Sequence, residues 1–140
     1  MRVLIVVAVV LALAVTGCAG RAVIGAPVQA GEGPDAPGAE VVARGETLFR
    51  AGVEGAPPCS GCHQTREGGY GFSLGPNLAG VASRAAERVA GLSAAAYLEE
   101  SILHPKNYVV GGFQVSMFAE YAAFLTPQEV EALVAYLLTL

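Results

Sequence analysis

Two cysteines and one histidine lie within five residues of each other, in the run Cys-Ser-Gly-Cys-His at residues 59–63. The pattern C-x-x-C-H is the attachment signature of a c-type haem. Two thiols on one helical turn can each form a thioether bond with a vinyl group of the porphyrin, and the adjacent histidine then faces the iron. The spacing therefore predicts one covalently attached haem c, bound by Cys59 and Cys62, with His63 as the proximal iron ligand.

Three other uses of the cysteine pair compete with haem attachment. A thioredoxin-like dithiol expects a strand before the motif, whereas the residues before it are Ala-Pro-Pro. A structural zinc ion needs four ligands, and the only further candidates are Cys18 and His104. A simple disulfide would leave His63 without a role. Haem attachment uses all three residues and is the interpretation we favour.

The third cysteine, Cys18, follows a sequence that resembles a bacterial export signal. Met1-Arg2 is a short positive start, residues 3–15 are all apolar, and Val-Thr-Gly-Cys at residues 15–18 looks like a lipobox. This order of regions predicts a signal peptide over residues 1–17 and lipid attachment at Cys18. The alternative is an uncleaved membrane helix, because about 17 apolar or weakly polar residues reach the lower limit for spanning a bilayer. Both alternatives place the rest of the chain on the periplasmic side of the cell membrane.

Residues 18–39 are predicted to be the lipid-attachment cysteine and a flexible linker. Glycine and proline fill residues 22–38, and no apolar periodicity runs through them. Such a segment has nothing to bury and behaves as a partly extended tether. The linker would hold a globular domain, residues 40–140, near the membrane while leaving it free to move.

The composition of the chain excludes some classes of protein. Hydrophobic residues make up 54% of the 140 residues, which is too apolar for a disordered tail. Twelve acidic residues stand against eight basic ones, so the chain lacks the basic footprint of a nucleic-acid-binding protein. Without the signal segment and its Arg2, the balance is seven against twelve, or −5. We therefore expect a partner surface that is less acidic, neutral or basic.

The sequence of residues 40–140 predicts helices and no strands. Residues 41–51 combine good helix formers with spaced apolar positions. Ser93 can cap a helix that ends before His104-Pro105, because the residue before proline resists helical angles. Thr126-Pro127-Gln128-Glu129 is a strong helix start, with threonine at the N-cap, proline in the first turn and glutamate completing a capping box.

Long glycine-rich stretches separate these helices, at residues 64–80 and 107–119. Loops of this length in a small domain usually surround something, and the haem motif indicates what that is. Four aromatic residues in these loops are candidates to pack on the haem or to meet its propionates. They are Tyr70, Phe72, Tyr108 and Phe113.

Residues 40–140 resemble a class I monohaem cytochrome c domain over nearly their whole length. In that family a Gly-x-x-x-aromatic pair on the first helix crosses a Leu-x-x-Tyr pair on the last. Gly45 and Phe49 match the first pair, and Leu133 and Tyr136 match the second. The resemblance implies an all-α cytochrome c fold wrapped around one covalently attached haem.

The same resemblance implies roles for two further residues. The family carries Gly-Pro-Asn-Leu after the haem motif, here residues 75–78. The carbonyl of its proline, Pro76, would accept a hydrogen bond from His63 and fix the orientation of that ring. Met117 stands in a loop before the last helix, where the family places its distal ligand, although Phe118 follows it where the family often has proline. His104 is the rival ligand.

A pair of axial ligands such as His63 and Met117 closes both positions on the iron, which favours electron transfer over catalysis. The resemblance implies a protein that is not itself an enzyme but transfers single electrons in a respiratory or photosynthetic chain. It would be a membrane-tethered carrier or the monohaem subunit of a quinol-oxidising or terminal oxidase complex, and its partners would be redox proteins of that chain. The stretch that starts at Ser101 also resembles cytochrome c domains of terminal oxidases. The alternative is a haem enzyme or gas sensor with an open sixth position.

Overall fold

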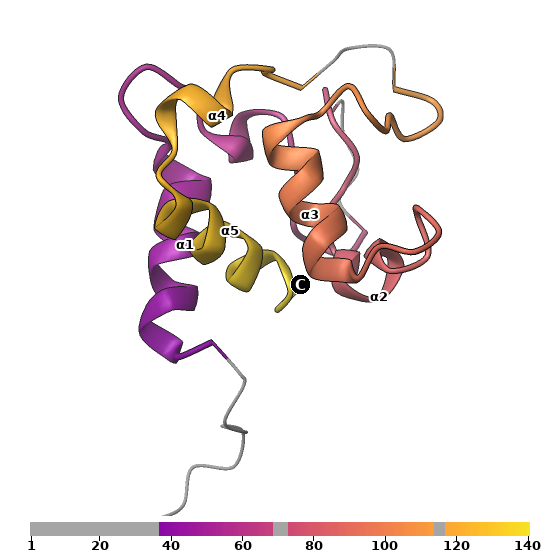
Figure 1. Ribbon diagram of the computed structural model, residues 1–140, viewed down its shortest axis with the longest axis horizontal. Coiled ribbons are helices and arrows are strands. Elements are labelled where there is room, and N and C mark those ends of the chain that lie inside the picture. Colours follow the sequence, from indigo (N-terminus) through magenta and orange to yellow (C-terminus); the bar gives the residue numbers. More distant parts are fainter. Residues whose placement is uncertain (1–36, 69–72, 114–116) are drawn as a thin grey trace, which may run out of the picture. The chain divides into compact units, whose positions relative to one another are not determined.

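Five α-helices and one short 3-10 helix form the regular structure in residues 37–68, 73–113 and 117–140, the parts of the chain that the computed structural model describes (Figure 1). In chain order they are α1 (Ala39–Ala51), η1 (Cys59–Gly61), α2 (Val81–Ala85), α3 (Ala94–Leu103), α4 (Tyr121–Phe124) and α5 (Pro127–Leu137). Within these ranges no strand is present beyond an isolated bridge between Val53 and Ala56. The prediction of an all-α domain is therefore confirmed.

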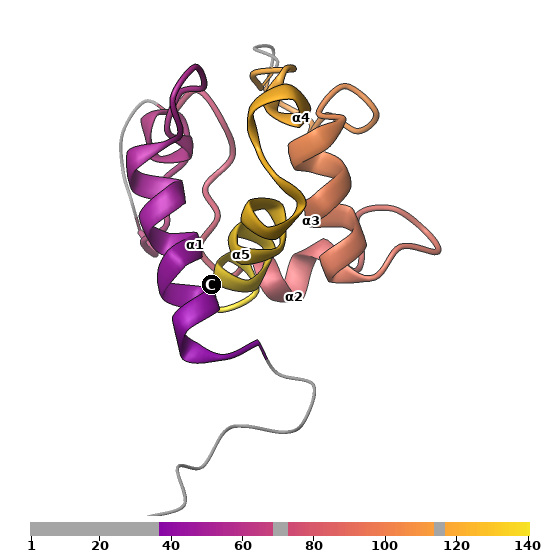
Figure 2. The same cartoon turned by 60° about the vertical axis from the view of Figure 1, so that its left-hand side comes forward.

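Helices α1 and α5 form the most extensive contact between helices in the described residues, and α5 lies between α1 and α3 in both views (Figures 1 and 2). Gly45 of α1 faces α5 so closely that a Cβ atom there would collide with the carbonyl oxygen of Ala132 and lie 2.8 Å from the Cβ of Tyr136. The rings of Phe49 and Tyr136 pack beside this contact, with centroids 5.5 Å apart. The absence of a side chain at residue 45 is what allows the two helices to approach.

Local sequence signals fix the start of α5. The hydroxyl of Thr126 accepts a hydrogen bond from the backbone N–H of Glu129, and the Glu129 carboxylate accepts one from the backbone N–H of Thr126. This is the capping box that the sequence predicted, with Pro127 in the first helical turn. Most of the helix that follows is buried, and its apolar face closes the core between α1 and α3.

Helix α3 also begins and ends where the sequence predicted. The side chain of Ser93 accepts a hydrogen bond from the N–H of Ala96 at 3.2 Å, and the helix stops at His104, directly before proline. Tyr97, Leu98 and Ile102 turn inward from it. No helix in the described part of the chain is long and apolar enough to cross a bilayer. The predictions for Cys18, the signal segment, Tyr70 and Phe72 lie outside the described residues.

Candidate haem site

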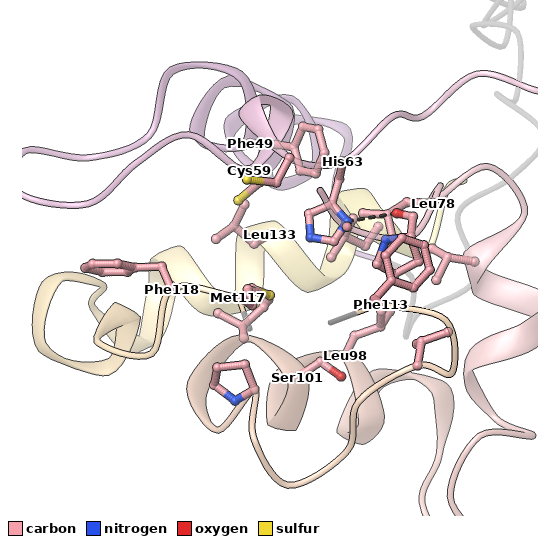
Figure 3. A pocket seen from close by; sticks show the side chains of 18 of the residues that line it. Phe49, Cys59, His63, Leu78, Leu98, Ser101, Phe113, Met117, Phe118 and Leu133 are labelled. Atoms are coloured by element: carbon pink, nitrogen blue, oxygen red, sulfur yellow. Dashed lines mark hydrogen bonds between the residues drawn. The ribbon is translucent and has the colours of Figure 1, made fainter. Parts of the chain in front are cut away.

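A mostly apolar pocket lies between α3, α5 and the two long loops, and it collects residues from almost every element (Figure 3). Phe49 contributes from α1, Leu98 from α3 and Leu133 from α5. The residues that carry the predicted chemistry also line it, namely Cys59, Cys62, His63, Pro76, Tyr108, Phe113 and Met117. Segments far apart in the chain therefore meet at one site.

The cysteine pair is positioned by the 3-10 turn η1. The backbone N–H groups of Cys62 and His63 both donate to the carbonyl oxygen of Cys59, at 3.1 and 3.0 Å. One tight turn therefore gathers both thiols and the imidazole. The two cysteines are free thiols and do not form a disulfide. Burial raises the pKa of the Cys59 thiol, partly offset by hydrogen bonding from Tyr121, so this thiol is neutral at pH 7 before attachment.

His63 is held in one orientation by its contact with Pro76. The imidazole Nδ1 lies 2.8 Å from the Pro76 carbonyl oxygen, the contact drawn as a dashed line in Figure 3. Because a carbonyl only accepts, Nδ1 carries the proton and Nε2 keeps its lone pair free. Burial lowers the pKa of His63, while the hydrogen bond to Pro76 partly opposes that change. The imidazole is therefore neutral at pH 7, which is the state that binds a metal.

The backbone at Gly75 also lies against the His63 ring. A Cβ atom at residue 75 would collide with Cε1 of His63 and lie 2.8 Å from its Nδ1. The N–H of Gly75 donates to the Cys62 carbonyl at 3.0 Å, and the Ser73 hydroxyl lies 2.6 Å from that same oxygen. Ser73 and Gly75, which follow the haem motif in the sequence, are thus hydrogen-bonded to its backbone at Cys62. The role of Ser73 could not be predicted from the sequence, because nothing local marks a loop serine as a bridge.

Met117 and His63 enter the pocket from different sides (Figure 3). Met117 is partly buried and packs against the hydrophobic core. His104 is exposed at the end of α3 and does not line this pocket. It borders a separate, smaller pocket together with Glu100 and Asn107. The structure therefore brings Met117, and not its rival His104, to the site of the cysteine pair.

Two arginines that the sequence analysis did not single out also line the pocket. Arg84 and Arg88 are its only permanently charged lining residues within the described ranges. The Arg84 guanidinium donates to the carbonyl oxygens of Ala79 at 2.6 Å and Asn77 at 3.0 Å, which holds it in place. Fixed cations suit the carboxylates that a haem carries.

The donor set fits a haem and not a simple metal ion. In residues 37–68, 73–113 and 117–140, no group of three or more His, Cys, Asp or Glu side chains could hold an ion. The pocket instead offers two thiols, an imidazole with a free Nε2, a thioether and an apolar lining. These are the groups that attach, ligate and surround a porphyrin.

A helical domain with a C-x-x-C-H turn facing an apolar pocket defines a small c-type haem protein. The chain belongs to the cytochrome c family, whose family model, described as "Cytochrome c", matches residues 42–140. No curated protein matches the chain. Membership confirms the predicted cofactor, one covalently attached haem c, and supports electron transfer as the general activity.

Proposed function

We propose that this protein is a membrane-tethered cytochrome that transfers single electrons in a respiratory or photosynthetic chain. The observation that carries the proposal is the meeting of His63 and Met117 in one apolar pocket, beside both thiols of the C-x-x-C-H turn. It would act as a carrier or as the monohaem subunit of a quinol-oxidising or terminal oxidase complex.

Each site residue has a distinct role in this proposal. Cys59 and Cys62 would form the thioether bonds to the haem, and His63 would supply Nε2 to its iron. Pro76 orients His63 through its carbonyl, which also raises the basicity of the ligand. Met117 would supply its thioether sulfur to the iron, and this soft ligand favours the ferrous state. When bound, the haem supplies an iron that exchanges one electron between the ferric and ferrous states.

The lining of the pocket contributes by keeping water away from the site. Leu98 and Leu133 are buried, and Phe113, which is partly buried, lines the same pocket. A dry site with both axial positions taken changes little when the charge on the iron changes, which suits fast electron transfer. His104, the chain's only histidine besides His63, lies outside this pocket and so is not placed to act there as a distal histidine.

The membrane tether rests on the sequence of the first 39 residues. A lipid on Cys18, or an uncleaved apolar segment, would hold the haem domain on the periplasmic side, and residues 18–39 would serve as the linker. Changing Cys18 to Ser tests the lipid directly. We expect the variant to incorporate no radioactive palmitate and to load haem normally, whereas continued labelling would contradict lipidation at Cys18.

Carbon monoxide binding tests the closed site. We expect the reduced wild-type protein to bind no carbon monoxide at neutral pH, because Met117 occupies the sixth position. Rapid binding would instead favour a haem enzyme or gas sensor. Copurification of the native protein from membranes then separates a free carrier, which elutes alone, from a subunit, which elutes with a complex.

A further inference from the structure

Tyr121 joins two parts of the haem site that are far apart in the sequence. It stands four residues after Met117, at the start of α4, and only 5% of its surface is exposed. Its hydroxyl donates a hydrogen bond of 2.8 Å to the carbonyl oxygen of Pro57, two residues before Cys59. The segment of the distal ligand is therefore fastened to the segment that enters the haem motif.

The neighbours of Tyr121 strengthen this connection. Its ring meets the ring of Phe118 edge-on, with centroids 5.0 Å apart, and Phe118 directly follows Met117. At the other end of α4, Phe124 lies so close to Gly55 that a Cβ atom at residue 55 would collide with Cε1 of the Phe124 ring and lie 2.7 Å from its Cδ1. The three aromatic residues thus form a clamp, Phe118–Tyr121–Phe124, between the chain after Met117 and the chain before Cys59.

We propose that Tyr121 is a positioning residue that keeps Met117 at the haem by fastening its segment to the Pro57 carbonyl. For Met117 to leave the iron, the chain around it must move, and the hydrogen bond from Tyr121 to Pro57 resists that movement. This inference rests on the proposed function, since it requires Met117 to be the axial ligand. The role is one of positioning, because the hydroxyl contacts the segment around Pro57 and Cys59 and not the Met117 side chain.

The environment of Tyr121 suits a permanent hydrogen-bond donor. Burial, more than any neighbouring charge, raises the pKa of its phenol well above the usual range. The hydroxyl therefore keeps its proton across the neutral pH range. Its acceptor is a backbone carbonyl, which no pH change within that range removes.

Imidazole displacement measures how easily the Met117 segment opens. Added imidazole can bind ferric iron only when Met117 has left, so its apparent dissociation constant scales inversely with the population of the open form. Loss of Met117 is followed by the disappearance of the sulfur-to-iron charge-transfer band. We expect Tyr121→Phe in the full-length ferric holoprotein to bind imidazole about tenfold more tightly, equivalent to about 1.4 kcal/mol. A change of that size matches one net hydrogen bond.

Tyr136→Phe is the matched control. It also removes one hydroxyl from a buried tyrosine, but at the crossing of α1 and α5 and outside the lining of the haem pocket. We expect its imidazole affinity to stay within about twofold of wild type, a change too small to report a lost hydrogen bond. Circular dichroism at the same temperature establishes that both variants are folded during the titration.

Three results would separate the possible failures. Equal imidazole affinity in wild type and Tyr121→Phe overturns the role of Tyr121 alone. Absence of the charge-transfer band in wild type overturns Met117 as ligand, and with it the proposed function. If Tyr121→Phe yields no holoprotein, Phe124→Leu decides, because Phe124 is 40% exposed and its truncation leaves the core intact. We expect Phe124→Leu to bind imidazole about threefold more tightly than wild type, because part of the packing is lost. Unchanged imidazole binding would contradict a role of the clamp in holding Met117.

Discussion

Two regions of this short domain differ in how completely their own side chains fill them. One is the α1–α5 crossing, and the other is the haem pocket. At the crossing the side chains close the space themselves, and Ala132 and Tyr136, which do not line the pocket, are 1% and 6% exposed. Around the pocket, apolar lining residues such as Leu74 and Val109 remain 41% and 50% exposed. The crossing is a fully packed core, whereas the loops surround a cavity that the protein's own side chains do not fill. The stability of the second region therefore depends on the haem, as small domains often depend on a bound group.

Removing both thiols should have the largest effect, because the region around the pocket depends on the attached haem for its stability. We expect the Cys59→Ala/Cys62→Ala chain to carry no covalent haem and to lose most of its helical structure. Without the haem the domain lacks its largest apolar core element and has little stability to spare. A pyridine haemochrome spectrum on denatured protein measures attachment, and circular dichroism measures helix content. Each single variant should retain one thioether bond or none, so a wild-type spectrum from either would contradict attachment at that cysteine.

Replacing Gly45 with a larger residue tests the packed α1–α5 crossing instead. A side chain there must push α1 and α5 apart, because its Cβ would collide with the Ala132 carbonyl. We expect Gly45→Val to lower the free energy of unfolding by about 3 kcal/mol or more, the upper range for overpacking, measured by denaturant titration of the holoprotein. Gly38→Ala is the control, since a Cβ at Gly38 meets nothing within 4 Å. Similar losses for both variants would show that the close crossing is not what stabilises α1 and α5.

Gly75→Ala tests the contact between the loop and His63. The new methyl group would occupy the space of the imidazole ring, so the ring must turn and its hydrogen bond to Pro76 must weaken. We expect the reduction potential and the electron paramagnetic resonance of the ferric protein to change, with a stability loss of about 1–3 kcal/mol. Gly111→Ala, in the other loop and with nothing within 4 Å, should leave the spectrum unchanged. A wild-type spectrum from Gly75→Ala would contradict the role given to this loop.

The smallest effect should come from the capping box of α5. Hydrogen bonds from the backbone and hydroxyl of Thr126 lower the pKa of Glu129, with a smaller contribution from Arg44. A carboxylate with a lowered pKa stabilises the fold above its unfolded pKa of about 4.3 and loses that contribution as the pH falls through the lowered value. Glu129→Gln should therefore flatten the dependence of the unfolding temperature on pH in this acidic window. Equal pH dependence in both proteins would contradict the contribution of Glu129.

The comparison also explains which features could be predicted from sequence. The start of α5, the cap of α3 and the haem turn are set by residues within a few positions of each other. Helices α2 and α4 were not predicted, because five and four residues carry too little periodicity to detect. The hydrogen bond from the Tyr121 hydroxyl to the Pro57 carbonyl joins residues 64 positions apart in the sequence. No local pattern marks such a contact, and the expectation for Met117 came mostly from the family resemblance, since Met1 is the only other methionine.

A closed electron-transfer site depends most on Met117 as the sixth ligand, and replacing Met117 with alanine tests this role most directly. We expect the ferric charge-transfer band of Met117→Ala to vanish, because the thioether sulfur that produces it is gone. The reduction potential should fall by a few multiples of about 59 mV, each a tenfold change for one electron, because ferrous iron loses its preferred soft ligand. His104→Ala should retain the band and the potential of the wild type. If Met117→Ala retains both while His104→Ala loses them, the assignment of the sixth ligand is wrong, and the case for a closed electron-transfer site fails with it.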